Sequence, residues 1–455
     1  MLLQIGAEIE HALMVQYLYA AYSLGGDQVP PEHRESVRRW QSTMLTVARE
    51  EMGHLISVQN LLTLVGGAVS LQRSDYPFDS PYYPFPLQLG PLTLDAIAKY
   101  VYAEMPLTLH RAATPSEVRV AEAVTRRVEH EEWHPHHVGK IYDEIIEIIK
   151  DPTRIPDSTF DPNSYARQAS WEEWGKGYRP EVGMTNPVLA EERRAGYGTD
   201  DLPWVERGAS VIVAQMGTRT EALAGLQQIS RQGEALTASV VARDRREPSH
   251  FERFVDVYEG IERAQALAGA KRWRPWRDVP VNPTTRAEWR RTRGFIESET
   301  SRDWADLFNL RYRMALTYLT HLFRLAGDTA CGPTPRPLRG PTLHRVFGEM
   351  YTMKTIAGIL MRSPLTDKRH DPRRAGPPFE MPYTLALPTS DVDCWRLHQE
   401  LLQNSLVLGK KLRRHEKAAD AARYLATLED VDRQGVAWID QVLAGHDAGR
   451  KGVKA

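Results

Sequence analysis

Two segments of the sequence place a glutamate three residues before a histidine, namely Glu51 with His54 and Glu247 with His250. On a helix, residues three apart point to the same side, so a carboxylate and an imidazole can hold one metal ion or two neighbouring ones. A single pair of this kind is more often part of a solvated helix face. Two pairs in one chain favour a metal site.

Two further glutamates lie where helical hairpins would bring them to these pairs. Glu10 precedes the segment of Glu51, and Glu234 precedes that of Glu247. Helical bundles that bind two metal ions use one Glu-x-x-His pair from each of two helices and a lone Glu from each of two others. Pro248 lies inside the second pair, and proline is tolerated in the first turn of a helix, so we expect Glu247 to begin its helix. The predicted metal ligands are Glu10, Glu51, His54, Glu234, Glu247 and His250.

The donor types limit the metal. Carboxylate oxygens with imidazole nitrogens suit iron or manganese, and zinc less well without a thiolate. We therefore expect two iron ions, with manganese or a mixed iron/manganese pair as the alternative. The chain has only two cysteines, Cys331 and Cys394, so we expect neither a disulfide scaffold nor a cysteine-ligated zinc or iron–sulfur site, and both are excluded at this stage.

Glu104 and Tyr17 are the candidate catalytic residues. Glu104 is a further inner-face carboxylate, although it could instead pair with an arginine or cap a helix. Tyr17 follows Glu10 by seven residues and so lies on the same helix face two turns on. It could hydrogen-bond a ligand or reach the cavity, or it could be an ordinary core tyrosine.

The elements that must position these residues are helices. Apolar periodicity and Gly/Pro breaks predict helices over 3–24, 31–65, 93–113, 117–150, 217–233, 247–269, 302–326, 342–362 and 391–446. The Pro- and aromatic-rich segment 73–91 is a long connection, which we expect to form a packed cover. The sequence shows no persuasive β-alternation.

These elements predict an all-α protein with a bundle domain and an added C-terminal part. We expect residues 1–269 to form the bundle that carries the metal site, with an excursion or lid over 151–205. Residues 270–300 are expected to be a linker, and 301–455 a helical region that packs on the bundle.

Composition restricts the partners. The formal net charge is −1, so nothing favours nucleic acid or an anionic membrane. No segment approaches the roughly 20 apolar residues of a membrane span, and the N-terminus lacks the pattern of a signal peptide. We expect a cytoplasmic protein that acts on a small molecule with dioxygen. A homo-oligomer stays open.

Several of these motifs resemble the ferritin-like domain of the violacein-pathway iminophenyl-pyruvate dimer synthase family. The similar segments span most of the chain in order: 8–12, 16–18, 21–24, 50–55, 60–62, 66–67, 100–104, 138–142, 232–234, 249–254, 308–312 and 375–380. The resemblance implies a ferritin-like fold and a role in bacterial secondary metabolism, in which amino-acid-derived imines are oxidised or coupled.

The function expected from these observations is that of a non-haem di-metal oxidoreductase that activates dioxygen. Two alternatives stay open. One is a ferroxidase or iron-handling protein, which in storage ferritins is a compact single bundle without a long aromatic connection. The other is a metal-free scaffold of the same fold.

Overall fold

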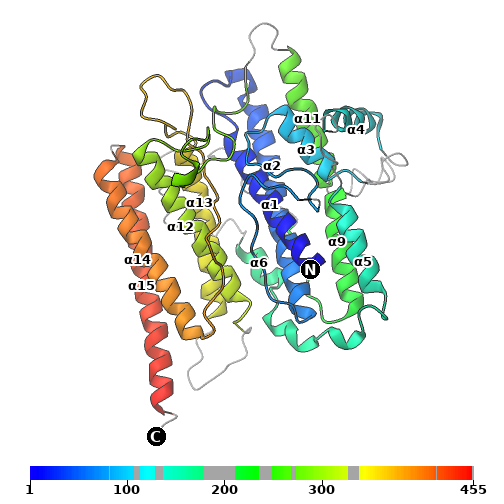
Figure 1. The fold of residues 1–455 in the computed structure, drawn as a ribbon, viewed down its shortest axis with the longest axis vertical. Helices are drawn as coiled ribbons and strands as arrows, with labels where there is room; N and C mark the ends of the chain where they lie inside the picture. The colour runs from blue at the N-terminus through cyan, green and yellow to red at the C-terminus, as the bar shows by residue number, and fades with distance from the viewer. Residues whose placement is uncertain are drawn as a thin grey trace. The chain divides into compact units, whose positions relative to one another are not determined.

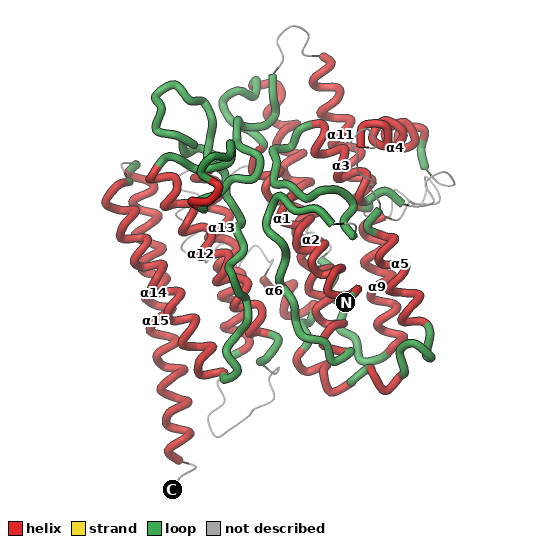
Figure 2. The backbone as a smooth tube through the Cα atoms, viewed as in Figure 1, coloured by secondary structure: helices red, strands yellow, loops and turns green. Residues whose placement is uncertain are grey.

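The computed structural model describes residues 1–80, 82–106, 113–128, 137–177, 211–234, 248–267, 273–325, 338–416 and 418–452. Within these ranges the regular elements are helices, and β-structure is limited to isolated bridges (Figure 2). The predicted all-α fold is therefore confirmed. No described helix is both long and apolar enough to cross a membrane.

The chain divides into two compact units. The first comprises residues 1–171 and 209–282, and the second comprises 172–208 and 283–455. The boundary between the units, after residue 282, thus falls inside the segment expected to be a linker, 270–300. The packing of the C-terminal region on the bundle stays a prediction.

The first unit begins with a long helical hairpin. Helix α1 (Leu2–Ser23) and helix α2 (Arg34–Leu64), the latter preceded by a short 3₁₀ turn at Pro31–His33, pack along each other (Figure 1). The turn between them uses Gly25 and Gly26, whose φ angles of 87° and 111° favour glycine. Because α1 is buried on almost every side, its polar side chains must find partners inside the protein.

The next bundle helix is interrupted. Helix α3 (Leu94–Ala103) stops after ten residues, and helix α5 (Gly139–Lys150) continues from its end. The Val138 N–H donates to the Ala103 carbonyl over 3.0 Å, so the two helices are joined across the intervening chain. That chain contains helix α4 (Pro115–Val128), so the single helix expected over 117–150 is wrong.

The opposite side of the bundle also consists of two successive helices. Helix α9 (Arg219–Glu234) lies beside α5, and helix α11 (His250–Leu267) lies beside α3 (Figure 1). Since α5 follows α3 end to end, α11 continues beyond α9 and does not fold back along it. The hairpin expected between Glu234 and His250 is therefore wrong, although both helix ends do meet at one level of the bundle.

The proline- and aromatic-rich connection packs along α1. The Tyr76 hydroxyl donates to the Ala12 carbonyl over 2.7 Å, and the Gln88 N–H donates to the Gln16 side chain over 3.3 Å. Tyr83 and Phe85 are buried. Tyr76, Tyr83 and Phe85 thus form the expected packed cover, whereas Phe78 and Tyr82 are exposed.

The second unit is a separate helical assembly. It contains the short helix α6 (Trp171–Gly177, from its second residue), α12 (Glu299–Leu322), α13 (Arg339–Leu360), α14 (Asp391–His415) and α15 (Ala419–Gly452). The single helix expected over 391–446 is two helices, because Glu416 adopts an extended conformation that ends α14. Helices α14 and α15 then pack as a hairpin.

A buried arginine joins all four long helices of this unit. Arg311 of α12 donates to both oxygens of Asp432 on α15 at 2.9 and 2.5 Å, and to Glu349 on α13 at 3.2 Å. It also donates to the Ser405 hydroxyl on α14 at 2.5 Å. Burial raises the pKa of Glu349 and the Arg311 charge lowers it, with a net rise. The guanidinium therefore compensates two carboxylates that would otherwise be unpaired in the core.

We expect an Arg311→Leu substitution to lower the free energy of unfolding of the second unit by about 3–5 kcal/mol, because Asp432 and Glu349 would lose their buried counter-charge. Urea denaturation followed by tryptophan fluorescence and circular dichroism would measure this. The matched control is Arg433→Leu on α15, whose side chain is about half exposed where it pairs with Glu429, so a change within about 1 kcal/mol is expected. Equal stabilities of the two variants would contradict the role assigned to Arg311.

Candidate metal centre

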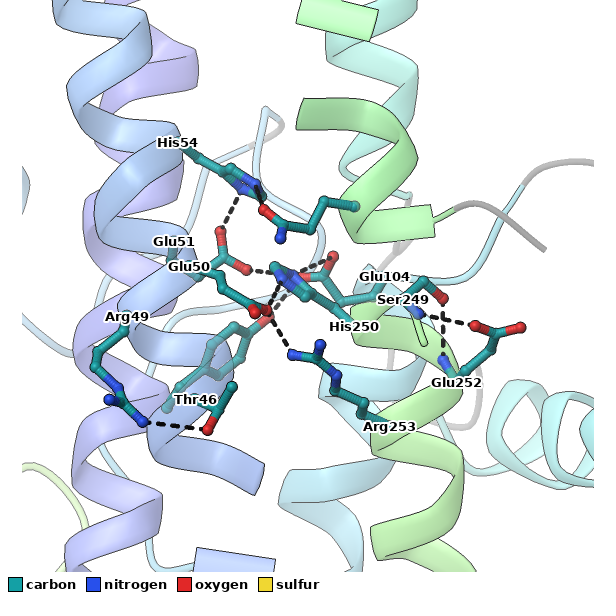
Figure 3. Close-up of polar contacts among 12 residues, drawn as sticks. Thr46, Arg49, Glu50, Glu51, His54, Glu104, Ser249, His250, Glu252 and Arg253 are labelled. Carbon is teal, nitrogen blue, oxygen red and sulfur yellow. Dashed lines mark hydrogen bonds and ion pairs between the residues drawn. The ribbon is translucent and has the colours of Figure 1, made fainter. Parts of the chain in front are cut away.

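The candidate site lies at the level where the interrupted helices end and restart. Helices α1 and α2 pass this level without a break and contribute Glu10, Glu51 and His54. The C-cap of α3 contributes Glu104, and the first residue of α11 contributes His250. All five side chains are buried (Figure 3 shows four of them).

Glu51 is at the centre of the cluster. Its Oε2 lies 3.0 Å from His54 Nδ1, and its Oε1 lies 2.8 Å from His250 Nδ1. The two imidazole rings stack with 5.4 Å between centroids. The two oxygens of one carboxylate therefore face two different histidines, which is the geometry of a carboxylate that bridges two sites.

One further carboxylate lies beyond each histidine. Glu10 Oε2 is 3.6 Å from His54 Nδ1, and Glu104 Oε2 is 3.8 Å from His250 Nδ1. The described residues thus form two similar halves around Glu51, with one histidine and one outer glutamate in each.

Gly53, inside the first Glu-x-x-His pair, has a packing role. A Cβ at this position would lie 2.5 Å from the Ile212 carbonyl oxygen, so only glycine lets the segment at 211–214 cross α2 here. The same segment is held by Ser57, whose hydroxyl accepts from the Ala214 N–H over 2.9 Å. This contact fixes the turn of α2 that presents His54.

The far nitrogen of each histidine has a partner that sets its orientation. His250 Nε2 lies 3.0 Å from Glu50 Oε2, and the Arg253 guanidinium donates to the same oxygen over 2.6 Å (Figure 3). His54 Nε2 lies 2.9 Å from the Gln232 side-chain oxygen. In both rings Nδ1 is left facing Glu51, and a metal-binding histidine typically has its other nitrogen hydrogen-bonded in this way.

Glu50 and Arg253 were missed in the sequence. Two features of the sequence could have indicated them. Glu50 adjoins Glu51, and Arg253 follows His250 by three residues and so lies on the same side of its helix. However, only the tertiary structure shows that α2 and α11 place these two charges opposite each other.

A tyrosine hydroxyl supports each outer carboxylate. Tyr17 donates to Glu104 Oε1 over 2.7 Å, and Tyr142 of α5 donates to Glu10 Oε1. The structure thus places Tyr17 in the polar cluster, where its ring also packs edge-on against Tyr100 and Phe254. Tyr142 was not singled out as a site residue, because its link to Glu10 depends on how α5 packs against α1.

Burial and mutual repulsion perturb the carboxylates strongly. Burial, then the neighbouring Glu51 charge, raises the pKa of Glu10 to about 8 and that of Glu104 to about 7. Burial opposes ionisation of Glu51 as well, but the charges of His250 and His54 hold its pKa well below the usual range. The three glutamates are therefore not equivalent, and Glu51 is the most readily ionised of them.

The histidines respond in the opposite direction. Burial alone would lower their pKa values, yet Glu51 and Glu50 raise the pKa of His250 to about 9. Glu51 and Glu10 similarly hold the pKa of His54 well above its ordinary value. Protons on these rings supply the positive charge that the carboxylates need, and a metal ion would replace them.

Two predicted ligands cannot be placed by their side chains. Glu234 is the last residue of α9, and its side chain lies outside the described part of the structure, as does the whole of Glu247. Helix α11 begins at His250 and not at Glu247 as expected. Ser249 and Glu252 form a reciprocal cap, in which the Ser249 N–H donates to Glu252 over 2.8 Å and the Glu252 N–H donates to the Ser249 hydroxyl over 3.3 Å.

The residues present fit a metal centre. Glu51, His54 and His250 each offer a ligand atom, and these atoms lie within 4.8 Å of one another. Glu51 Oε1 and His250 Nδ1 face each other at 2.8 Å as a buried ion pair, and the ring proton that holds this pair together is one that a metal ion could replace. A mixed carboxylate and imidazole donor set suits a first-row transition metal.

Comparisons with known proteins give a consistent result. The chain is similar to the dichlorochromopyrrolate synthase of Lentzea aerocolonigenes, with 26% identity over 417 residues. The match covers 86% of this chain and 36% of that enzyme, so the chain spans little more than a third of the relative's length. No solved structure matches the chain significantly.

The family comparison covers the part of the chain that forms the cluster. The family model described as "Ferritin-like" matches residues 3–259, which include all five clustered side chains and every helix of the first unit up to α11. The ferritin-like fold implied by the sequence motifs is thereby confirmed, and the chain belongs to the ferritin-like family.

Proposed function

We propose that the first unit is a dioxygen-using oxidoreductase with two metal ions, most simply iron, and that its substrate is a small amino-acid-derived molecule. The observation that carries this proposal is the two-fold arrangement around Glu51, in which each carboxylate oxygen faces a different buried imidazole. The family and the relative, which is named a synthase, support an enzyme over a storage protein.

The arrangement suggests a role for each side chain. Glu51 would bridge the two metal positions, with His54 and Glu10 on one side and His250 and Glu104 on the other. Glu104 then takes the place of the lone carboxylate that was assigned to Glu234. Gly233 fits this view, since a Cβ there would come within 3.1 Å of Glu104 Oε2. Ligation by Glu234 and Glu247 stays a prediction.

When bound, the metal pair would supply the electrons and the electrostatic stabilisation for reduction of dioxygen. The protein's own residues orient the ligand side chains and balance their charges. Glu50, held by Arg253, fixes the His250 ring, and Gln232 fixes that of His54. Tyr17 and Tyr142 hold protons next to Glu104 and Glu10, and the buried surroundings keep bulk water from the cluster.

We expect the protein reconstituted with ferrous iron to bind about two equivalents per chain. Glu51→Gln and His250→Ala should each reduce the bound iron at a fixed free concentration, roughly tenfold or more by analogy with losses of supporting residues. Glu147→Gln on the exposed surface of α5 is the matched control and should leave iron binding unchanged. Iron content measured after gel filtration gives the result, and full retention in the Glu51 variant would remove the bridging role.

Parallel alanine variants decide between the two lone carboxylates. Glu104→Ala should lose more iron than Glu234→Ala if Glu104 is the ligand, and the reverse order would restore Glu234. Circular dichroism should show unchanged helicity in both, because apolar packing and not the metal holds this bundle together.

Metal affinity should rise with pH. Binding requires neutral imidazoles and ionised carboxylates, whereas the raised pKa values of about 7, 8 and 9 for Glu104, Glu10 and His250 mean that these groups carry protons at and below neutrality. Between about pH 6 and 9 the affinity for zinc, used as a redox-inactive probe, should increase, and fewer protons should be released per zinc ion as the pH rises. Titration calorimetry in buffers of different ionisation enthalpy counts these protons. A pH-independent affinity without proton release would contradict the protonation states given above.

The iron-loaded protein should consume dioxygen when an aromatic amino acid or its imine is supplied. Tyr17→Phe should keep its iron but turn over more slowly, because Glu104 loses its hydrogen-bond donor. An oxygen electrode combined with product analysis measures both effects. Iron uptake well beyond two equivalents with no substrate-dependent oxygen consumption would favour the iron-handling alternative.

A further inference from the structure

A second group of side chains with metal-ligand atoms lies in the second unit, apart from the Arg311 cluster. His321 lies in the last turn of α12, while Asp391 and Cys394 lie in the first turn of α14. Each offers a ligand atom, and the three atoms lie within 4.8 Å of one another. An imidazole, a carboxylate and a thiolate together are donors that zinc-type ions accept.

His321 has an orphaned nitrogen that points to this group. Its side chain is fully buried (0% exposed), and its Nε2 has no hydrogen-bond partner among the described residues. That nitrogen lies 3.9 Å from Asp391 Oδ1, which is too far for a hydrogen bond. A buried polar atom in this position needs a partner, and one metal ion between the three side chains would provide it.

The other nitrogen of the ring is already fixed. His321 Nδ1 lies 3.0 Å from His398 Nε2. His398 is itself held by stacking on Tyr318, with 4.0 Å between ring centroids. This hydrogen bond holds the His321 ring in one orientation and, when Nδ1 is the donor, leaves the Nε2 lone pair free for a metal, as second-layer partners of metal-binding histidines do.

The charges around the group also fit. The Cys394 thiol donates to the Pro388 carbonyl over 3.3 Å, and the Arg324 guanidinium is 3.6 Å from the sulfur. Burial, together with the charges of Asp391 and Asp393, raises the pKa of the Cys394 thiol, while the Arg324 guanidinium lowers it, so a metal ion bound here would displace the thiol proton. A divalent ion bound by one thiolate and one carboxylate is neutral overall, so Arg324 does not repel it.

We propose that His321, Asp391 and Cys394 bind a divalent transition-metal ion of the zinc class, which ties the end of α12 to the start of α14. The expectation that two cysteines exclude a cysteine-ligated zinc site holds only for a cysteine-only site, because one cysteine suffices beside a histidine and an aspartate. Zinc-ligand bonds of about 2.0–2.3 Å place ligand atoms about 1 Å closer together than the 4.8 Å limit here. The half-exposed Asp391 side chain is free to make that movement. Three protein ligands leave one coordination position for water or a small molecule.

Cobalt(II) titration of the full chain tests the proposal, because a cobalt–thiolate bond gives a near-ultraviolet charge-transfer band. The candidate centre of the first unit has no cysteine among its ligands, so this band reports a cysteine-containing site alone. We expect the wild-type protein to show the band, Cys394→Ser to lose it, and Glu51→Gln to retain it. Cys331→Ser is the matched control and should also retain it.

A milder variant guards against a folding defect in Cys394→Ser. Asp391→Asn changes a half-exposed side chain at a helix start, so helicity and melting temperature should be nearly unchanged, while cobalt affinity at the thiolate band should fall roughly tenfold or more. Absence of the band in the wild-type protein would overturn the proposal. So would its loss in Cys331→Ser with retention in Cys394→Ser, or an unchanged affinity in Asp391→Asn.

Discussion

The first unit depends on how charge is compensated around Glu51. Three carboxylates and two imidazoles are buried within a few ångströms, and burial disfavours ionisation of each of them. The cost of an unpaired buried charge is several kcal/mol. In the protein alone the compensation comes from protons on the histidines, and these are exchangeable. Such a site can accept a metal ion readily. The positive charge of the ion replaces that of the released protons, and the same carboxylates balance it.

The second unit also buries carboxylates, but their counter-charge is of a different kind. There the buried carboxylates Glu349 and Asp432 share Arg311, a cation that cannot lose its proton in a protein, and burial raises the pKa of Glu349. The guanidinium also contacts Ser405, so that one side chain from each of four helices meets at one point. A permanent cation makes this cluster a fixed structural joint, whereas the exchangeable protons around Glu51 suit a site that binds and reacts.

The interrupted helices explain how the carboxylates and histidines reach one level of the bundle. A continuous helix presents side chains only from its flank. The end of α3 instead places Glu104 at a C-cap, and the start of α11 places His250 at its first residue. The hydrogen bond from Val138 to Ala103 keeps α3 and α5 joined, so the break adds a site residue without opening the bundle. The Ser249–Glu252 cap fixes the start of α11 and hence the position of His250.

The sequence by itself determined the helical class, the α1–α2 hairpin and the Glu51–His54 pair, because apolar periodicity, glycine breaks and the three-residue spacing are local properties of a helix. It also identified Glu10, His250, Glu104 and Tyr17 as residues of interest. Only the tertiary structure decided that α9 and α11 are successive and not a hairpin, and that α3 and α5 are one interrupted helix. It alone revealed the roles of Glu50, Arg253 and Tyr142. Glu50 lies 200 residues from His250 and 203 from Arg253 along the chain, and Tyr142 lies 132 residues from Glu10. Such contacts depend on which helix faces pack together, and no spacing along the chain encodes that choice.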